Sequence, residues 1–92
     1  MKAVIILPTY NEKENIEKMI RKVFSLPKDF HVLIIDDGSP DGTAQKIKEL
    51  QKEFSTKLFL IERAGKQGLG TAYIAGFNWA LERSYAYVFE MD

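Results

Sequence analysis

Unbroken aliphatic runs alternate along this chain with segments whose apolar residues recur every three or four positions. The run 32–35 is typical of a strand buried on both faces, whereas the spacing of Ile16, Ile20 and Val23 is typical of one helical face. The pattern predicts strands at 3–7, 30–36, 57–62 and 85–91, with helices at 12–25, 44–54 and 71–83 between them. Strands that alternate with helices favour an α/β fold with a parallel sheet, right-handed crossovers and helices on its faces.

Proline and capping residues set the expected ends of these elements. Pro8 cannot donate to a sheet ladder, so the first strand should close there. Asn11 is a good N-cap for the first helix, and Pro27 prevents that helix from continuing. Ser39 or Asp41 is expected to cap the second helix.

The length and charge of the chain exclude several classes of function. Ninety-two residues make at most one small domain. Thirteen basic and thirteen acidic residues balance without a basic stripe, so no nucleic-acid partner is indicated. The absence of cysteine removes disulfides and thiolate metal sites and is compatible with a reducing cytoplasm. The aliphatic runs are too short to span a bilayer, and no signal-peptide layout precedes the first strand.

The segment 32–43 is the most informative stretch, because an apolar strand there stops on two carboxylates and then turns into a helix. Glycines and a proline force a tight turn, which leaves Asp36 and Asp37 at the carboxyl end of the strand. In an open parallel sheet that edge carries the ligand-binding crevice. The alternative is a solvated turn whose polar residues only cap the helix.

Acidic side chains from several strand ends should meet at this edge. The predicted topology brings Glu12, Asp36, Asp37 and Asp92 to one rim. Like charges gathered there repel unless a hard divalent cation neutralises them or a ligand donates N–H and O–H groups to them. A sugar nucleotide meets both needs, because its base and ribose carry donors and its diphosphate brings Mg²⁺ or Mn²⁺. We therefore expect Glu12, Asp37 and Asp92 to surround a shared hollow.

Other phosphate and metal motifs are absent. The glycine loop 65–70 lacks the spacing and position of a dinucleotide fingerprint, and neither a P-loop nor an EF-hand occurs. His31, the only histidine, begins a strand away from the ligand edge and is expected to be structural. Arg63 and Lys66 could contact phosphate or a carboxylate, or could be ordinary surface cations. Tyr10 could stack on a base or simply pack.

Three motifs together resemble the family 2 glycosyltransferases of the GT-A fold, most closely the dolichol-phosphate or polyprenol-phosphate mannosyltransferases. The motifs are Leu7-Pro8-Thr9-Tyr10-Asn11-Glu12, the segment 34–43, and the segment 65–73 with Gly76. The resemblance spans nearly the whole chain. It implies a Rossmann-like nucleotide-binding half with a four-stranded parallel sheet in the order 3-2-1-4 and three helices. Residues 1–92 would be the sugar-nucleotide-binding N-terminal part of a GT-A domain, truncated after its fourth strand.

The resemblance also implies a nucleotide-sugar site formed by Pro8, Tyr10, Glu12, Ile35, Asp37 and Asp92. The first three would line the nucleotide site, and the next two would meet the base and ribose. Asp92 looks like the first aspartate of the family's Asp-x-Asp metal motif, which carries Mg²⁺ or Mn²⁺. The resemblance assigns no catalytic residue within this segment.

In such enzymes the donor is GDP-mannose or a related sugar nucleotide, and the acceptor is a dolichol or polyprenol phosphate that attacks with inversion. The resemblance thus implies a cytoplasmic protein at the cytoplasmic face of a membrane. We expect the 92 residues alone not to turn over, because half of the metal motif and the acceptor groove would lie elsewhere.

Two other functions stay open at this point. One is a transferase that uses another donor, such as UDP-glucose. The other is a non-catalytic α/β interaction module that binds a partner through the uncharged helix 71–81. A receiver-like phosphoacceptor domain is disfavoured, because its acidic pair should follow the first strand and here the pair follows the second.

Overall fold

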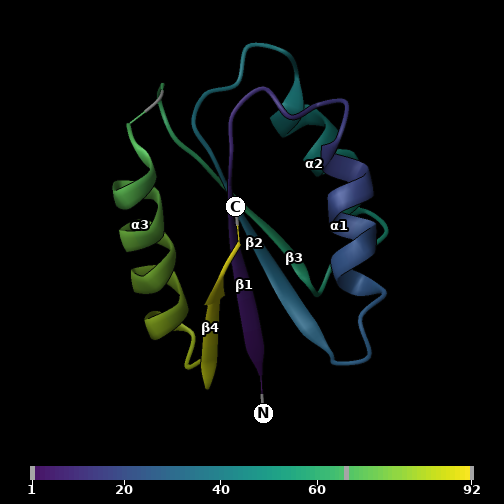
Figure 1. The fold of residues 1–92 in the computed structure, drawn as a ribbon, viewed down its shortest axis with the longest axis vertical. Helices are drawn as coiled ribbons and strands as arrows, with labels where there is room; N and C mark the ends of the chain where they lie inside the picture. The colour runs from purple at the N-terminus through teal and green to yellow at the C-terminus, as the bar shows by residue number, and fades with distance from the viewer. Residues whose placement is uncertain (1, 66, 92) are drawn as a thin grey trace.

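Four parallel strands form one sheet between two layers of helices in the computed structural model, which describes residues 2–65 and 67–91 (Figure 1). The strands are β1 (Ala3–Thr9), β2 (Phe30–Asp36), β3 (Leu58–Glu62) and β4 (Tyr87–Glu90). The helices are α1 (Ile16–Phe24), α2 (Thr43–Gln51) and α3 (Leu69–Glu82). The sheet order is β3-β2-β1-β4 with every pairing parallel, which confirms the predicted α/β fold and its strand order.

Successive residues of the central strands face opposite helix layers, so a separate core lies on each face of the sheet. Ile5 and Leu7 pack with α1 and α2, whereas Val4 and Ile6 pack with α3. Both faces of β1 and β2 are therefore buried. This explains why the two strands read as unbroken aliphatic runs and not as alternating patterns.

β1 continues through Pro8 to Thr9, whereas the sequence predicted that it would close at the proline. The N–H of Met91 donates to the C=O of Ile6 at 3.0 Å, so the backbone of Ile6 faces β4. Pro8 lies two residues further on and faces the same side, where the pairing with β4 has already ended at Ile6 and Glu90. The missing N–H of Pro8 therefore removes no ladder hydrogen bond, and the strand can continue.

The first helix begins at Ile16 and not at residue 12, so the prediction that Asn11 caps it is wrong. The C=O of Glu12 accepts the N–H groups of Asn15 and Ile16 at 3.0 and 2.8 Å, and these bonds form a turn ahead of α1. Asn11 lies before this turn with φ +55°, and Asn15 occupies the N-cap position. Asparagine tolerates the left-handed conformation better than most residues, which suits it to a turn.

Of the two residues predicted to cap the second helix, Asp41 contacts its start. The Oδ1 atom of Asp41 accepts the N–H of Thr43, the first residue of α2, at 3.0 Å. Gly42 lies between them in the N-cap position with φ +94°. Ser39 instead donates its hydroxyl to Asp36. The third helix starts slightly earlier than predicted, at Leu69, and β3 and β4 are slightly shorter than predicted.

α3 approaches the sheet closely at Gly76, where an added Cβ would lie 2.7 Å from two carbons of the Ile6 side chain. We expect Gly76→Ala to lower the free energy of unfolding by about 1–2 kcal/mol, because overpacking against a fully buried residue outweighs the gain in helix propensity. Urea unfolding measures this difference. Gly70→Ala is the matched control, since nothing lies within 4 Å of its Cβ and the change should be neutral or stabilising. Equal losses in both variants would contradict the role of close packing.

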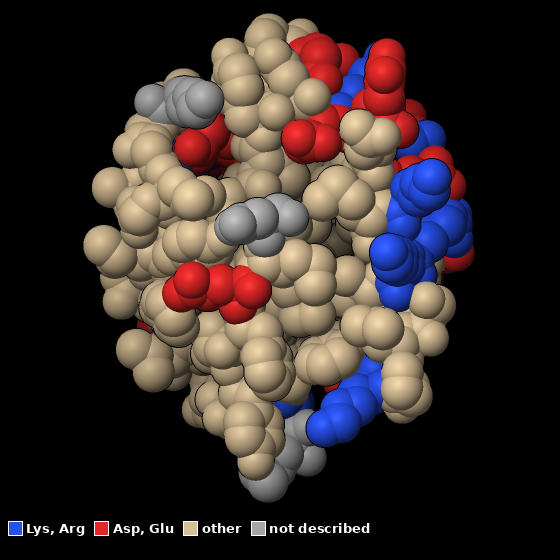
Figure 2. Space-filling view, viewed as in Figure 1, with Lys and Arg blue, Asp and Glu red and all other residues tan. Residues whose placement is uncertain are grey.

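The outer face of α3 exposes apolar side chains. Ile74 and Leu81 are 61% and 73% exposed. In Figure 2 the surface over α3, at the left, is mostly uncharged, whereas lysines, arginines and acids gather over α1 at the right. Tyr87 and Phe89 of β4 are about half exposed as well. Among the residues that the structure describes, none of the helices has both the length and the hydropathy needed to cross a bilayer.

Candidate functional site

The carboxyl ends of β1 and β2 and the start of α3 enclose a hollow of about 140 Å³, called here the edge hollow. The residues that line it are Pro8, Thr9, Tyr10, Asp37, Gly68 and Leu69. The loops that follow β1, β2 and β3 lie together at the top of Figure 1. The predicted ligand edge of the sheet therefore contains a hollow, and Pro8, Tyr10 and Asp37 are among its walls.

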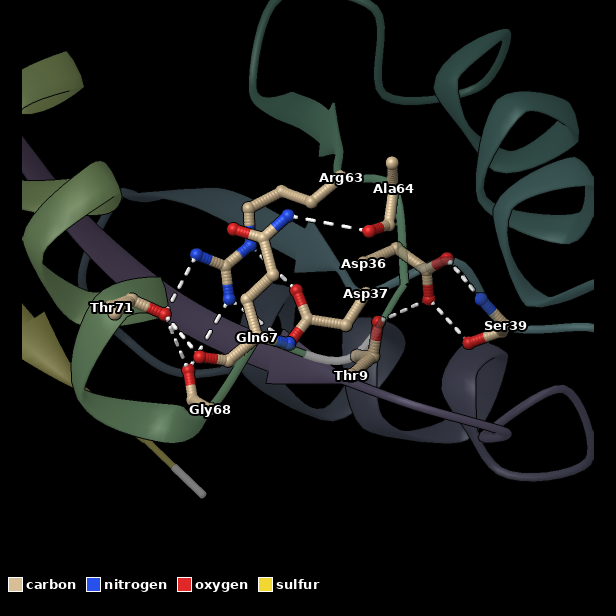
Figure 3. Close-up of polar contacts among 9 residues, drawn as sticks. All are labelled: Thr9, Asp36, Asp37, Ser39, Arg63, Ala64, Gln67, Gly68 and Thr71. Atoms are coloured by element: carbon tan, nitrogen blue, oxygen red, sulfur yellow. Dashed lines mark hydrogen bonds and ion pairs between the residues drawn. The ribbon is translucent and has the colours of Figure 1, made fainter.

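Asp37 is fixed in the edge hollow by Arg63, which follows β3 (Figure 3). The Nε and Nη2 atoms of Arg63 donate to the two carboxylate oxygens of Asp37 at 2.6 and 3.0 Å. The side chains of Arg63 and Asp37 are only 10% and 9% exposed. Arg63 also donates to the hydroxyl of Thr71 at 3.1 Å and to the C=O of Gly68 at 3.3 Å. One guanidinium thus ties the acid, the glycine loop and the start of α3 together.

This geometry decides between the two interpretations of Arg63. Arg63 forms a nearly buried ion pair with Asp37 of the same chain. It is therefore not an ordinary surface cation, and in this conformation it is not free to contact a phosphate. A bidentate ion pair of this kind fixes the plane of the carboxylate. Asp37 therefore presents its remaining lone pairs in a set direction, as an acceptor for N–H or O–H donors.

Asp36 does not join Asp37 in the edge hollow, which corrects the expectation that both acids share one rim. Side chains of neighbouring strand residues point to opposite faces, and Figure 3 shows Asp36 turned toward Ser39 and Thr9. The Oδ1 atom of Asp36 accepts the hydroxyls of Thr9 and Ser39 at 2.8 and 2.7 Å, and its Oδ2 accepts the N–H of Ser39 at 3.1 Å. Asp36 is 1% exposed, so its lone pairs serve the fold.

The other residues of the predicted site fall into three groups. Glu12 is partly exposed near the hollow but is not part of its lining. Ile35 is fully buried in the core beneath α3, so a ligand at this edge could meet only its backbone. Asp92 and Lys66 lie outside the described residues. Within residues 2–65 and 67–91, no three histidine or acidic side chains lie close enough to hold a metal ion.

His31 lies near the start of β2, at the end of the sheet opposite the edge hollow. Its Nδ1 atom is 2.8 Å from the hydroxyl of Tyr85, and the two rings meet edge to face. Burial lowers the pKa of His31 and raises the pKa of Tyr85. The pair is a packed, hydrogen-bonded contact, in agreement with the structural role predicted for His31.

Several features of the site were missed in the sequence. Thr9, Gly68 and Leu69 line the hollow but carry no strong chemical signal of their own. The two loops also touch at Gly38, where an added Cβ would lie 2.6 Å from the backbone nitrogen of Gly65. The sequence signal for this contact was the presence of a glycine in each loop, Gly38 beside the acids and Gly65 near Arg63, because glycine permits two backbones to approach closely.

The chain matches a known protein family over most of its length. The family described as glycosyl transferase family 2 matches residues 4–92. This match covers nearly the whole chain, including every residue that lines the edge hollow.

Two relatives are at least 40% identical in sequence to this chain. A polyprenol monophosphomannose synthase of Mycolicibacterium smegmatis is 42% identical over 99% of this chain and 34% of its own length. An undecaprenyl-phosphate mannosyltransferase of Micrococcus luteus is 40% identical over 100% of this chain and 37% of its own length. The chain thus spans about a third of the length of these relatives.

A solved structure has the same fold. A mannosyltransferase from Pyrobaculum calidifontis, solved in complex with GDP-Man and Mn²⁺, superposes with a TM-score of 0.80 at 24% identity. The superposition covers 86% of this chain and 24% of that protein. At this level of identity the likeness supports the shared architecture of strands and helices.

Proposed function

This chain belongs to glycosyl transferase family 2, and from that premise we propose that its protein transfers mannose from GDP-mannose to a polyprenyl or dolichyl phosphate, with inversion. The observation that carries the proposal is the fixed carboxylate of Asp37 in a hollow at the ligand edge of the sheet. The names of the relatives favour this donor and acceptor class.

In the proposed complex the edge hollow takes the nucleotide end of the donor. Asp37 accepts hydrogen bonds from N–H groups of the base or O–H groups of the ribose, because a carboxylate offers acceptors only. Tyr10, which is 39% exposed at the hollow, offers a face for the base to stack on. Pro8 supplies an apolar wall, and Glu12 follows Tyr10 two residues further along the chain.

We propose Mg²⁺ or Mn²⁺ as the cofactor and Asp92 as one of its ligands. The choice rests on the family resemblance and on the Mn²⁺ present in the similar mannosyltransferase. Asp37 does not fit this role here, because Arg63 already neutralises its charge. When bound, the metal would stabilise the negative charge on the departing nucleotide diphosphate.

We propose that the protein acts at the cytoplasmic face of a membrane, because the family resemblance implies this location and a polyprenyl phosphate is held in a bilayer. A donor such as UDP-glucose is the alternative within the same reaction class. A non-catalytic interaction module is a second candidate, which the exposed apolar side chains Ile74 and Leu81 on α3 favour.

Calorimetric titration of the full-length protein with GDP, GDP-mannose and UDP, with and without Mn²⁺, tests the proposal. We expect guanine nucleotides to bind, and Tyr10→Ala to weaken GDP binding about tenfold through lost base stacking. Tyr87→Ala is the matched control, because it removes another exposed tyrosine far from the hollow, on β4. Binding of UDP but not of GDP would mean that the donor is a uridine nucleotide sugar. If the protein bound none of these nucleotides, the proposed transferase function would be excluded.

A further inference from the structure

Three successive backbone N–H groups, at residues 11–13, each donate to a side chain of the 39–43 segment. The N–H of Asn11 donates to the Ser39 hydroxyl at 2.8 Å, and the N–H of Glu12 donates to the Thr43 hydroxyl at 3.0 Å. The N–H of Lys13 donates to Oδ2 of Asp41 at 3.1 Å. The loop after β1 is therefore fixed by side chains of the loop after β2, residue by residue.

Each of the two hydroxyls also donates a hydrogen bond to a carboxylate. The Ser39 hydroxyl donates to Asp36 at 2.7 Å, and the Thr43 hydroxyl donates to Asp41 at 2.5 Å. Because each hydroxyl gives its proton to an acid, its lone pairs are left to accept the backbone N–H. The Thr43 hydroxyl is also the main reason that the pKa of Asp41 lies below its usual value, so the acid stays charged.

The loop that these contacts hold contains a residue in the left-handed region. Asn11 has φ +55°, a conformation that is uncommon for residues with a Cβ but that asparagine tolerates better than most, and the three contacts fix it here. Tyr10 lies immediately before this residue and lines the edge hollow, and Glu12 lies immediately after it. The direction of both side chains therefore depends on the fixed backbone between them.

We propose that Ser39, Asp41 and Thr43, with Asp36 behind them, are positioning residues for the nucleotide site. They contact no nucleotide; they hold the backbone of residues 11–13 so that Tyr10 and Glu12 face the ligand beside Asp37. This inference rests on the function proposed above. It divides the acids of the segment into two roles, because Asp37 alone faces the edge hollow while Asp36 and Asp41 orient hydroxyls.

Thr43→Val tests the proposal, because valine keeps the shape of threonine and removes the acceptor for the Glu12 N–H. We expect the affinity of the full-length protein for GDP to fall about tenfold, since misplaced binding groups lose much of their effect. Thr43→Ser keeps the hydroxyl and should stay within about threefold of the wild type. Ser39→Ala, which removes the acceptor for the Asn11 N–H, should weaken GDP binding in the same direction.

Ile47→Val is the matched control for stability, because Ile47 is fully buried in the same helix and lies outside the hydrogen-bonded loops. It should lower the melting temperature by a few degrees, as Thr43→Val does, while leaving GDP affinity unchanged. Amide hydrogen exchange gives a second readout. Exchange at residues 11–13 should accelerate in Thr43→Val and not in Ile47→Val.

The outcomes separate this inference from the proposed function. If the wild-type protein binds none of the nucleotides, the proposed function fails and the positioning role fails with it. If the wild type binds GDP and Thr43→Val binds it equally well, only the positioning role is overturned. An equal loss of GDP affinity in Ile47→Val would also overturn it, because general destabilisation would then account for the effect.

Discussion

Asp37→Ala is expected to lower the free energy of unfolding by about 3–5 kcal/mol, the largest effect of any substitution considered for this protein. The substitution leaves the Arg63 guanidinium nearly buried without its counter-charge, since its side chain is only 10% exposed. Arg63 would keep only the neutral contacts to Thr71 and Gly68. Urea unfolding followed by far-UV circular dichroism measures the loss.

The double variant Asp37→Leu with Arg63→Met is the control that separates charge from shape. Replacing both members of a buried ion pair by apolar residues of similar size is often nearly neutral, so most of the lost stability should return. Nucleotide binding should not return, because the carboxylate acceptor is absent from both variants. An Asp37→Ala protein with the urea midpoint of the wild type would show that the ion pair contributes little.

Gly38→Ala is expected to cost about 2–4 kcal/mol and to disturb the edge hollow. Gly38 has φ +68°, where a Cβ is strained, and that Cβ would lie 2.6 Å from the backbone nitrogen of Gly65. Backbone cannot move aside as a flexible side chain can, so the loop that carries Arg63 must shift. Unfolding in urea and calorimetric titration with GDP measure the two consequences.

Gly65→Ala is the matched control for Gly38→Ala. Gly65 also has positive φ, at +81°, but nothing lies within 4 Å of an added Cβ, so only the backbone strain of about 1–2 kcal/mol applies. GDP affinity should therefore fall more in Gly38→Ala than in Gly65→Ala. The reverse order would mean that the two loops do not depend on their close contact.

The strands were the most predictable part of the fold, because β1 and β2 are buried on both faces and carry continuous aliphatic runs. Their alternation with helices was enough to predict a parallel sheet. The first helix was placed wrongly, because Asn11 looks like an N-cap in the sequence but lies before α1 in the left-handed conformation. The bonds that fix this conformation come from side chains 28 or 31 residues further along the chain, which local patterns do not reveal.

The candidate site was predictable in place but not in detail. The carboxyl edge of the sheet follows from the topology, and Asp37 does face a hollow there. The partner of Asp37 was not predictable, because Arg63 is 26 residues away and many basic residues could have occupied that position. The grouping of Asp36 with Asp37 ignored the alternation of strand side chains, a rule that would have separated the two acids.

The register of β2 against β1, in which Asp36 lies opposite Thr9, has a consequence for engineering. Adding or deleting one residue within Phe30–Asp36 would exchange the directions of the two acids. Asp36 would then turn toward the guanidinium of Arg63, and Asp37 would turn toward the hydroxyl of Ser39. To transfer this edge to another scaffold, the strand must keep the register that sets which face each acid points to, as well as the identity of its last residues.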